Sequence, residues 1–281
     1  GRKNAIQMTR RVAQSLGCAE EEVLVASTGV IGEPLPMPAL RSGIPVAVDS
    51  LSESGWRAAA EAIRTTDTFA KLASRKVRLG GKSATIVGIA KGSGMIEPDM
   101  ATMLSFLSTD AHVSPAYLRG VLRRTADRTF NRVSVDGEGS TSDSVIALAG
   151  GAAGNRRLTK RSEPDAEVFE EAFCKVAEEL AQSLARDGEG ATKLVTVAVS
   201  GAHSAAEADR AARRIANSML VKTALFGGDP NWGRILQTVG AGRIKMRSEA
   251  VHVRLGGVTV FRRGASAGTG ARVRLGGCAR A

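Results

Sequence analysis

The sequence is poor in cysteine, histidine and aromatic residues, and these shortages exclude several classes of protein. Three cysteines and three histidines are scattered through 281 residues. No CxxC spacing occurs, so the sequence predicts neither a zinc site nor a disulfide framework. Aromatic residues make up only 4%, and a folded core would therefore consist mainly of alanine, valine, leucine and isoleucine. We expect no metal, no cofactor and a reducing, cytoplasmic setting.

Long hydrophobic runs are also missing. The longest lies near residues 145–149 and is too short to span a bilayer, and the N-terminal residues contain no apolar signal core. Hydrophobic residues make up 43% and charged residues 24% of the chain, which is typical of a soluble globular protein. The length suffices for one large α/β domain or two smaller ones. The sequence thus predicts no membrane partner.

Acidic residues are scarce at one end only. The formal charge of the chain is +11, and residues 243–281 contribute +8 of it. The other 242 residues are nearly balanced, and no run of aromatic residues accompanies the basic segment. Proteins that bind single-stranded nucleic acids combine a positively charged groove with aromatic side chains on which the bases stack. Because the basic segment has no such run of aromatic residues, we expect no nucleic-acid partner.

Periodicity and turn residues predict an alternation of helices, strands and glycine-rich turns. Helices are expected at 4–16, 52–63, 115–125, 143–149, 166–186 and 204–219, with a short one from Pro38; strands are expected at 21–28, 82–89 and 193–199; 103–107 is an apolar stretch, 150–165 a loop, and the C-terminal segment is strand-like. The segment 229–234, DPNWGR, is interpreted as a turn followed by an aromatic plug.

The segment with the most chemical content is 88–104, GIAKGSGMIEPDMATML. A strand leads into a glycine-rich turn that begins at Lys91, and Ala101 precedes Thr102 at the start of an apolar stretch. The hydroxyl of Thr102 can attack the carbonyl of Ala101, and hydrolysis of the resulting ester would free the α-amine of Thr102. That amine can then act as a base for the hydroxyl. On the residues alone, an ordinary entrance to a strand is the competing interpretation.

Two familiar phosphate and nucleophile motifs fail in this chain. The GKS at 81–83 lacks the glycine that a phosphate loop needs five positions earlier, where Lys76 stands. The GSG at 92–94 would need glycine in place of Lys91 to form a nucleophile elbow.

The segment at 88–104 resembles the cleavage motif of the ornithine acetyltransferase (glutamate N-acetyltransferase) family, which is close to KGSGMI-x-P-(N/D)-MATML. Other stretches resemble this family in the same order: VLVASTGVIGEPLPM at 23–37, TTDTFAK at 65–71, VDGEGSTSDSVIALA at 135–149, DGEGATKLVTVAVSGA at 187–202 and SMLVKTALFGGDPNWGRI at 218–235. The resemblance covers roughly residues 4–260.

The resemblance implies an α/β enzyme of the N-terminal-nucleophile type, with stacked sheets and flanking helices, that cleaves itself between Ala101 and Thr102. Residues 1–101 would form the α chain and 102–281 the β chain, with an atypical basic tail from about 262. Thr102 would carry an acetyl group from N2-acetylornithine to glutamate in arginine biosynthesis. Acetyl-CoA is a further substrate of some family members. Two α and two β chains commonly assemble.

The resemblance also assigns roles to single residues. Thr28 and Gly29, in STGVIG, match the oxyanion-hole pair, although a strand-ending turn is the simpler interpretation. Lys91 matches a substrate contact whose ammonium could hold an α-carboxylate; otherwise it is a solvated loop lysine. Thr65 matches the hydroxyl contact, with Thr68 as the alternative register and a turn hydroxyl as the competing interpretation.

Glu189, in DGEGATK, matches a substrate-binding glutamate and could pair with the side-chain ammonium of ornithine; a solvated loop acid is the alternative. Family members usually have several tens of residues before the segment that starts here. They also end in an Asn-x-x-Tyr-Thr type terminus, whereas this sequence has no asparagine after Asn231. Two other functions therefore stay open: an amidase or aminopeptidase that uses the same threonine with water as acceptor, and an inactive homologue or basic binding protein.

Overall fold

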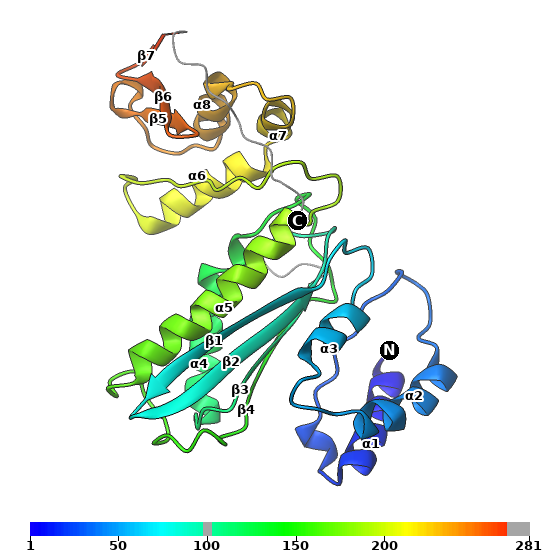
Figure 1. Cartoon of the computed structure of the whole chain (residues 1–281). Helices are drawn as coiled ribbons and strands as arrows, with labels where there is room; N and C mark the ends of the chain where they lie inside the picture. The colour runs from blue at the N-terminus through cyan, green and yellow to red at the C-terminus, as the bar shows by residue number, and fades with distance from the viewer. Residues whose placement is uncertain (98–102, 269–281) are drawn as a thin grey trace.

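The computed structural model describes residues 1–97 and 103–268, and its centre is a four-stranded sheet in the order β1-β2-β3-β4 (Figure 1). The strands are β1 (Lys71–Leu79), β2 (Lys82–Lys91), β3 (Leu104–Thr109) and β4 (Ser144–Ala149). Strand β2 is antiparallel to both β1 and β3, and β4 pairs with β3 in parallel. The chain is therefore a mixed α/β protein, as the sequence predicts.

Two helices cover one face of this sheet. They are α4 (Pro115–Arg128) and α5 (Ala166–Arg186), and α5 packs along β1 and β2. The apolar stripe of α5 is buried against the sheet, and Phe169 and Phe173 are fully buried in it. Gly88 faces the helix so closely that a Cβ there would lie 2.8 Å from Leu107 Cδ2 and from Leu180 Cδ1. Glycine therefore permits the close approach of helix and sheet.

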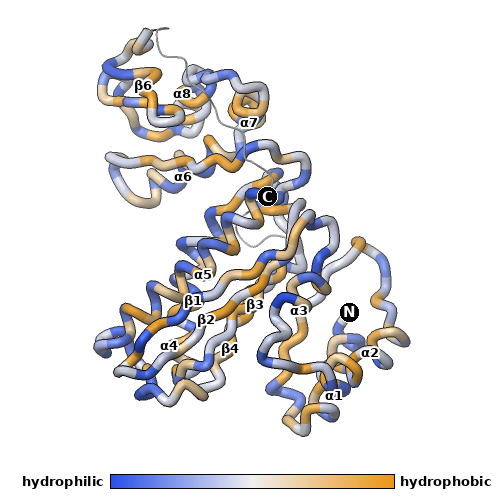
Figure 2. Tube along the Cα trace, in the orientation of Figure 1, coloured by the Kyte–Doolittle hydropathy of each residue, from blue (hydrophilic) through white to orange (hydrophobic). Residues whose placement is uncertain are grey.

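The other face of the sheet is apolar but only partly covered. Val87, Phe106 and Ile146 are half-buried on this face, and Leu148 is 55% exposed. Figure 1 shows α3 (Trp56–Ala62) on this side of the sheet, away from α4 and α5. Figure 2 shows that hydrophobic residues gather along the strands. No second sheet packs on this face among the described residues, so the expected stacked sheets are not seen there.

The N-terminal part is helical. It consists of α1 (Arg2–Leu16), a 3-10 turn η1 (Glu20–Glu22), α2 (Met37–Asp49) and α3. Helix α1 ends where predicted, because Gly17 adopts a left-handed conformation with φ of 70° that closes the helix. Helices α1 and α2 pack on one another.

The C-terminal part contains α6 (Ala205–Asn217), α7 (Met219–Phe226) and α8 (Trp232–Ala241), followed by a small antiparallel sheet. The sheet comprises β5 (His252–Leu255), β6 (Val258–Arg262) and β7 (Ala265–Ser266), after the 3-10 turn η3 (Ser248–Ala250). The rings of Trp232 and Phe261 lie 4.8 Å apart. This ring contact agrees with the interpretation of Trp232 as an aromatic residue that packs in the fold.

Three predicted elements were wrong, and one strand was not predicted. The segment 143–149 is strand β4 rather than a helix, since a short apolar run fits either state and here a neighbouring strand is available. The expected strands at 21–28 and 193–199 are not formed, because no strand of the described chain pairs with them. Strand β1 was missed because its exposed positions carry Arg75, Lys76 and Arg78, which hide the alternation.

Other elements agree with the sequence. Helix α5 spans the predicted 166–186, and β2 extends the predicted 82–89 by two residues. Helix α4 begins at the predicted Pro115, where the side chain of Ser114 accepts a hydrogen bond from the backbone N–H of Tyr117. No helix within the described ranges is long and apolar enough to cross a membrane.

Candidate active site

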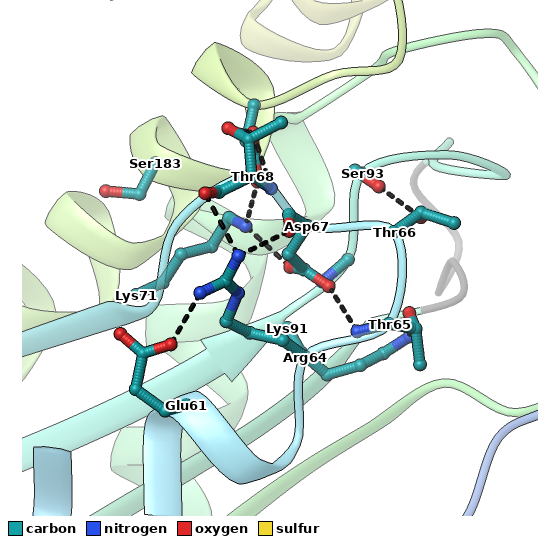
Figure 3. Close-up of polar contacts among 12 residues, drawn as sticks. Glu61, Arg64, Thr65, Thr66, Asp67, Thr68, Lys71, Lys91, Ser93 and Ser183 are labelled. Atoms are coloured by element: carbon teal, nitrogen blue, oxygen red, sulfur yellow. Dashed lines mark hydrogen bonds and ion pairs between the residues drawn. The ribbon is translucent and has the colours of Figure 1, made fainter. Parts of the chain in front are cut away.

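The predicted substrate contacts Thr65 and Lys91 touch one another at the end of β2. Lys91 is 3% exposed, and its Nζ donates a hydrogen bond of 3.2 Å to Thr65 Oγ1. Thr65 lies in the loop between α3 and β1, 26 residues earlier in the chain. Figure 3 shows both residues at the end of the sheet. The lysine is thus buried, not solvated.

The lysine lies among charged groups that act on its pKa in opposite directions. Burial lowers the pKa of Lys91 from its ordinary value, because water no longer solvates the ammonium. The carboxylates of Asp67 and Asp143 oppose this shift, whereas the ammonium of Lys71 adds to it. The balance leaves the ammonium of Lys91 more acidic than that of an exposed lysine.

Thr68, the alternative register, is committed elsewhere. Its hydroxyl donates to Asp187 Oδ1 over 2.5 Å, and its backbone N–H donates to Asp187 Oδ2 over 3.0 Å. Thr65 is therefore the threonine of the TTDT motif whose hydroxyl meets Lys91.

Glu189 joins the same region from the loop after α5. Its backbone N–H donates to Ser93 O over 2.7 Å, and the hydroxyl of Ser93 lies 2.5 Å from that of Thr66. The carboxylate of Glu189 lies over Gly94, where a Cβ would approach its Cδ to 2.8 Å. The side chain is exposed. A solvent-accessible carboxylate therefore lies beside the turn that directly follows the buried Lys91.

The glycine-rich turn after β2 is held by carboxylates on both sides. Asp67 Oδ1 accepts from the backbone N–H of Gly92 over 2.7 Å. Asp136 accepts from the N–H groups of Met95 and Ile96 over 2.5 and 2.9 Å. Met95 has a positive φ of 53°, which is uncommon outside glycine. The two aspartates therefore fix an unusual backbone conformation.

Asp143 is a residue of this site that sequence reasoning missed. Its Oδ1 accepts from the backbone N–H of Met103 over 2.9 Å, while its Oδ2 is buried with no hydrogen-bond partner. Burial raises the pKa of Asp143 to about 6, against the opposing effects of the Met103 N–H and Lys91. A cavity of about 280 Å³ adjoins Asp143 and Met103 beneath α4. The feature of the sequence that could have indicated Asp143 is its position directly before the apolar run 144–149.

The remaining predicted residues are not joined to this group. Ala101 and Thr102 lie outside the described residues. The register of the sheet nevertheless pairs Leu104 with Lys91, so the chain re-enters the sheet beside the lysine two residues after Thr102. Thr28 and Gly29 lie before the turn at 30–32, and no hydrogen bond links them to Lys91, Thr65 or Glu189 in the described part of the chain.

No cluster of three or more metal-ligating side chains occurs in the described ranges. The site combines a buried ammonium, a hydroxyl and an open carboxylate at the end of a sheet. These groups complement the carboxylate and ammonium of an amino acid. Fold and site thus define a mixed α/β protein with groups of opposite charge at one end of its central sheet.

Comparison with known proteins gives the family. The ArgJ family profile matches residues 1–274. The arginine biosynthesis bifunctional protein ArgJ of Synechococcus sp. is 48% identical over 264 residues, which cover 94% of this chain and 63% of that protein. The protein of the same name from Geobacter sulfurreducens is 48% identical over 274 residues, which cover 98% of this chain and 70% of that protein. The chain therefore belongs to the ArgJ family, which confirms the resemblance seen in the sequence motifs.

A solved structure agrees with this assignment. The crystal structure of the arginine biosynthesis bifunctional protein ArgJ from Bacillus halodurans matches with a TM-score of 0.56 and 40% sequence identity. The match covers 58% of this chain and 76% of that chain. This chain spans 63% to 70% of the length of the two curated relatives named above.

Proposed function

We propose that this chain is an acetyltransferase that moves an acetyl group from N2-acetylornithine to glutamate through an ester on Thr102. The family membership supports this reaction. The observation that carries it is the contact between Lys91 and Thr65, with the carboxylate of Glu189 against Gly94 on the adjoining turn. Three segments far apart in the sequence thus bring together groups that complement an amino acid.

The reaction begins with self-cleavage. Thr102 Oγ attacks the carbonyl carbon of Ala101, the peptide C–N bond breaks, and an ester with a free α-amine forms. Water hydrolyses this ester, which leaves residues 1–101 as an α chain and 102–281 as a β chain. The new amine of Thr102 can then accept the proton of its own hydroxyl. We further propose that α and β chains assemble as α2β2.

Transfer then proceeds in two half-reactions. Thr102 Oγ attacks the acetyl carbonyl of N2-acetylornithine, and ornithine leaves with its α-amine restored. The amine of glutamate attacks the acetyl ester, which forms N-acetylglutamate and returns the free hydroxyl. The N–H groups at Thr28 and Gly29 would stabilise both oxyanions. Acetyl-CoA could supply the acetyl group in the same way.

Each proposed binding group would contact a substrate group that carries the opposite charge or accepts its hydrogen bond. The ammonium of Lys91 and the hydroxyl of Thr65 would hold the α-carboxylate that both substrates share. The carboxylate of Glu189 would pair with the side-chain ammonium of ornithine, which glutamate lacks. The acceptor and the donor can thus use one site in turn.

The test is the release of ornithine from N2-acetylornithine by the purified chain, with and without glutamate. Release that depends on glutamate, with parallel double-reciprocal plots, is expected of the two-step transfer. Release that is independent of glutamate would instead show hydrolysis, as in an amidase. Absence of release from a fully cleaved preparation would contradict the proposal.

A variant tests the role of Glu189 within this reaction. Glu189→Ala should raise the KM for N2-acetylornithine at least tenfold, because one charge-assisted contact is lost. The matched control is Glu179→Ala, which removes an exposed glutamate of α5 that pairs with Arg75 of β1. An unchanged affinity of the Glu189 variant would rule out the pairing with ornithine.

A further inference from the structure

Three charged side chains meet in the interior beside the proposed substrate site. Lys71 is 1% exposed, and its Nζ lies 2.6 Å from Asp67 Oδ1 and 2.6 Å from Asp187 Oδ2. The side chains of Lys71 and Asp67 are fully buried, and that of Asp187 is 2% exposed. The three residues come from β1, from the loop before it and from the end of α5, and Figure 3 shows Asp67 and Lys71.

Each carboxylate of this group holds the backbone of a segment that carries a proposed substrate residue. Asp67 accepts from the N–H of Thr65 over 3.1 Å and from the N–H of Gly92, next to Lys91, over 2.7 Å. Asp187 accepts from the N–H of Thr68 and lies two residues before Glu189. Thr65 and Glu189 therefore each lie two residues from a carboxylate of the group, and Lys91 directly precedes a residue whose backbone the group holds.

The charges of the group are poorly explained by stability alone. Burial of ions carries a desolvation cost that can exceed their attraction, and well-packed apolar side chains are often as stable in their place. Burial on its own would raise the pKa of Asp67, but hydrogen bonds from Gly92 and Lys71 outweigh it and hold the pKa below its ordinary value. The carboxylate is thus kept ionised where its oxygens fix the backbone.

The group also acts across the sheet on the proposed binding lysine. The register of β1 and β2 pairs Lys71 with Ala90, so Lys71 and Lys91 point to opposite faces of the sheet. One ammonium and two carboxylates give the group a net charge of −1, which complements the ammonium of Lys91. Asp67 is the largest of the influences that keep the pKa of Lys91 from falling further.

We propose that Lys71, Asp67 and Asp187 form a buried ion triad that positions Thr65, Lys91 and Glu189 to bind an amino-acid substrate. The three are positioning residues, since none of them needs to touch the substrate. This inference rests on the proposed function, because it deepens the description of the same site.

The first test does not depend on activity. Asp67→Asn keeps the size of the side chain but places an amide N–H₂ against the Thr65 N–H or the Lys71 ammonium. Hydrogen exchange in peptides that cover 65–68 and 92–94 should accelerate at least tenfold in this variant. The control Glu179→Gln, which removes an exposed carboxylate between α5 and β1, should leave both peptides unchanged. Equal protection in the Asp67 variant and the wild type would overturn the proposal.

The second test separates positioning from mere stability. Asp67→Asn and Asp187→Asn should each raise the KM for N2-acetylornithine at least tenfold, measured well below the unfolding midpoint, with kcat changed less than threefold. A purely structural role would reduce the amount of active protein, which lowers the apparent kcat and leaves KM unchanged. That pattern would contradict the proposal.

The two proposals fail in different ways. A wild-type chain that is cleaved but transfers no acetyl group overturns the proposed function, and the exchange test still decides whether the triad fixes the loops. Transfer with normal KM in both aspartate variants overturns the triad and leaves the function standing.

Discussion

The two faces of the four-stranded sheet differ in how far they are packed. On one face α5 buries Phe169, Phe173 and Leu180 against β1 and β2. On the other face Phe106 and Ile146 remain half-buried, and Leu148 is mostly exposed. The proposed binding residue Lys91 points to this second face, and the ion triad lies toward the first. We propose that the packed face supports the segments that carry the binding residues.

The largest effect is expected from truncation of the packed face. Phe173 is fully buried, and its ring lies 5.8 Å from that of Phe169. Phe173→Ala should lower the free energy of unfolding by about 3–5 kcal/mol, because it leaves a cavity between α5 and the sheet. Denaturant unfolding of the purified chain measures this loss.

The matched substitution on the open face is Leu148→Ala. Since Leu148 is 55% exposed, its truncation should cost less than about 1 kcal/mol. Equal losses at the two positions would show that the faces are packed alike and would remove the contrast.

A smaller effect is expected where helix and sheet approach most closely. Gly88→Ala places a methyl group 2.8 Å from Leu107 and Leu180, and such overpacking costs about 1–3 kcal/mol. The control is Gly43→Ala within α2, where a Cβ meets nothing within 4 Å and alanine should stabilise the helix by up to about 1 kcal/mol. Thermal unfolding that ranks the two variants in the opposite order would show that α5 does not press on the sheet at Gly88.

The smallest effect concerns pH. Because the pKa of Asp143 is raised to about 6, the folded chain binds the proton of this group more tightly than the unfolded chain does. The stability that this group contributes is present below its ordinary pKa and is lost as the pH rises through 6. Asp143→Asn should therefore raise the unfolding midpoint, relative to wild type, more at pH 7 than at pH 4.5.

The control for this experiment is Asp209→Asn, which removes one half-buried negative charge on α6 that pairs with Arg213. If the wild type and the Asp143 variant keep a constant difference in unfolding midpoint from pH 4.5 to 7, the raised pKa is contradicted.

The sequence predicts those elements whose buried face follows from the spacing of their own apolar residues. Helix α5 has a continuous apolar stripe and was placed at its observed limits, and Gly17 marked the end of α1. Strands depend on partners that a local pattern does not reveal. The patterns of 21–28 and 193–199 predict strands, yet neither segment pairs with a strand in the described part of the chain. The pattern of 143–149 predicts a helix, but the segment forms β4 because it pairs with β3.

The site was predicted in the same uneven way. The family motifs brought Thr65, Lys91 and Glu189 into consideration, and the structure joins the first two by a hydrogen bond. The sequence does not predict the triad, because Lys71 and Asp187 are 116 residues apart. Such a contact is set by the packing of α5 on β1 and leaves no local pattern in the sequence.

The central claim is that Thr102 breaks the peptide bond that precedes it and then carries the acetyl group. Intact-mass spectrometry of the purified chain and of Thr102→Ala tests it most directly. We predict two fragments from the parent chain, the second beginning at Thr102, and a single unbroken chain that transfers no acetyl group from the variant. A variant that is still cut between residues 101 and 102, or that still transfers acetyl at the normal rate, would contradict the account.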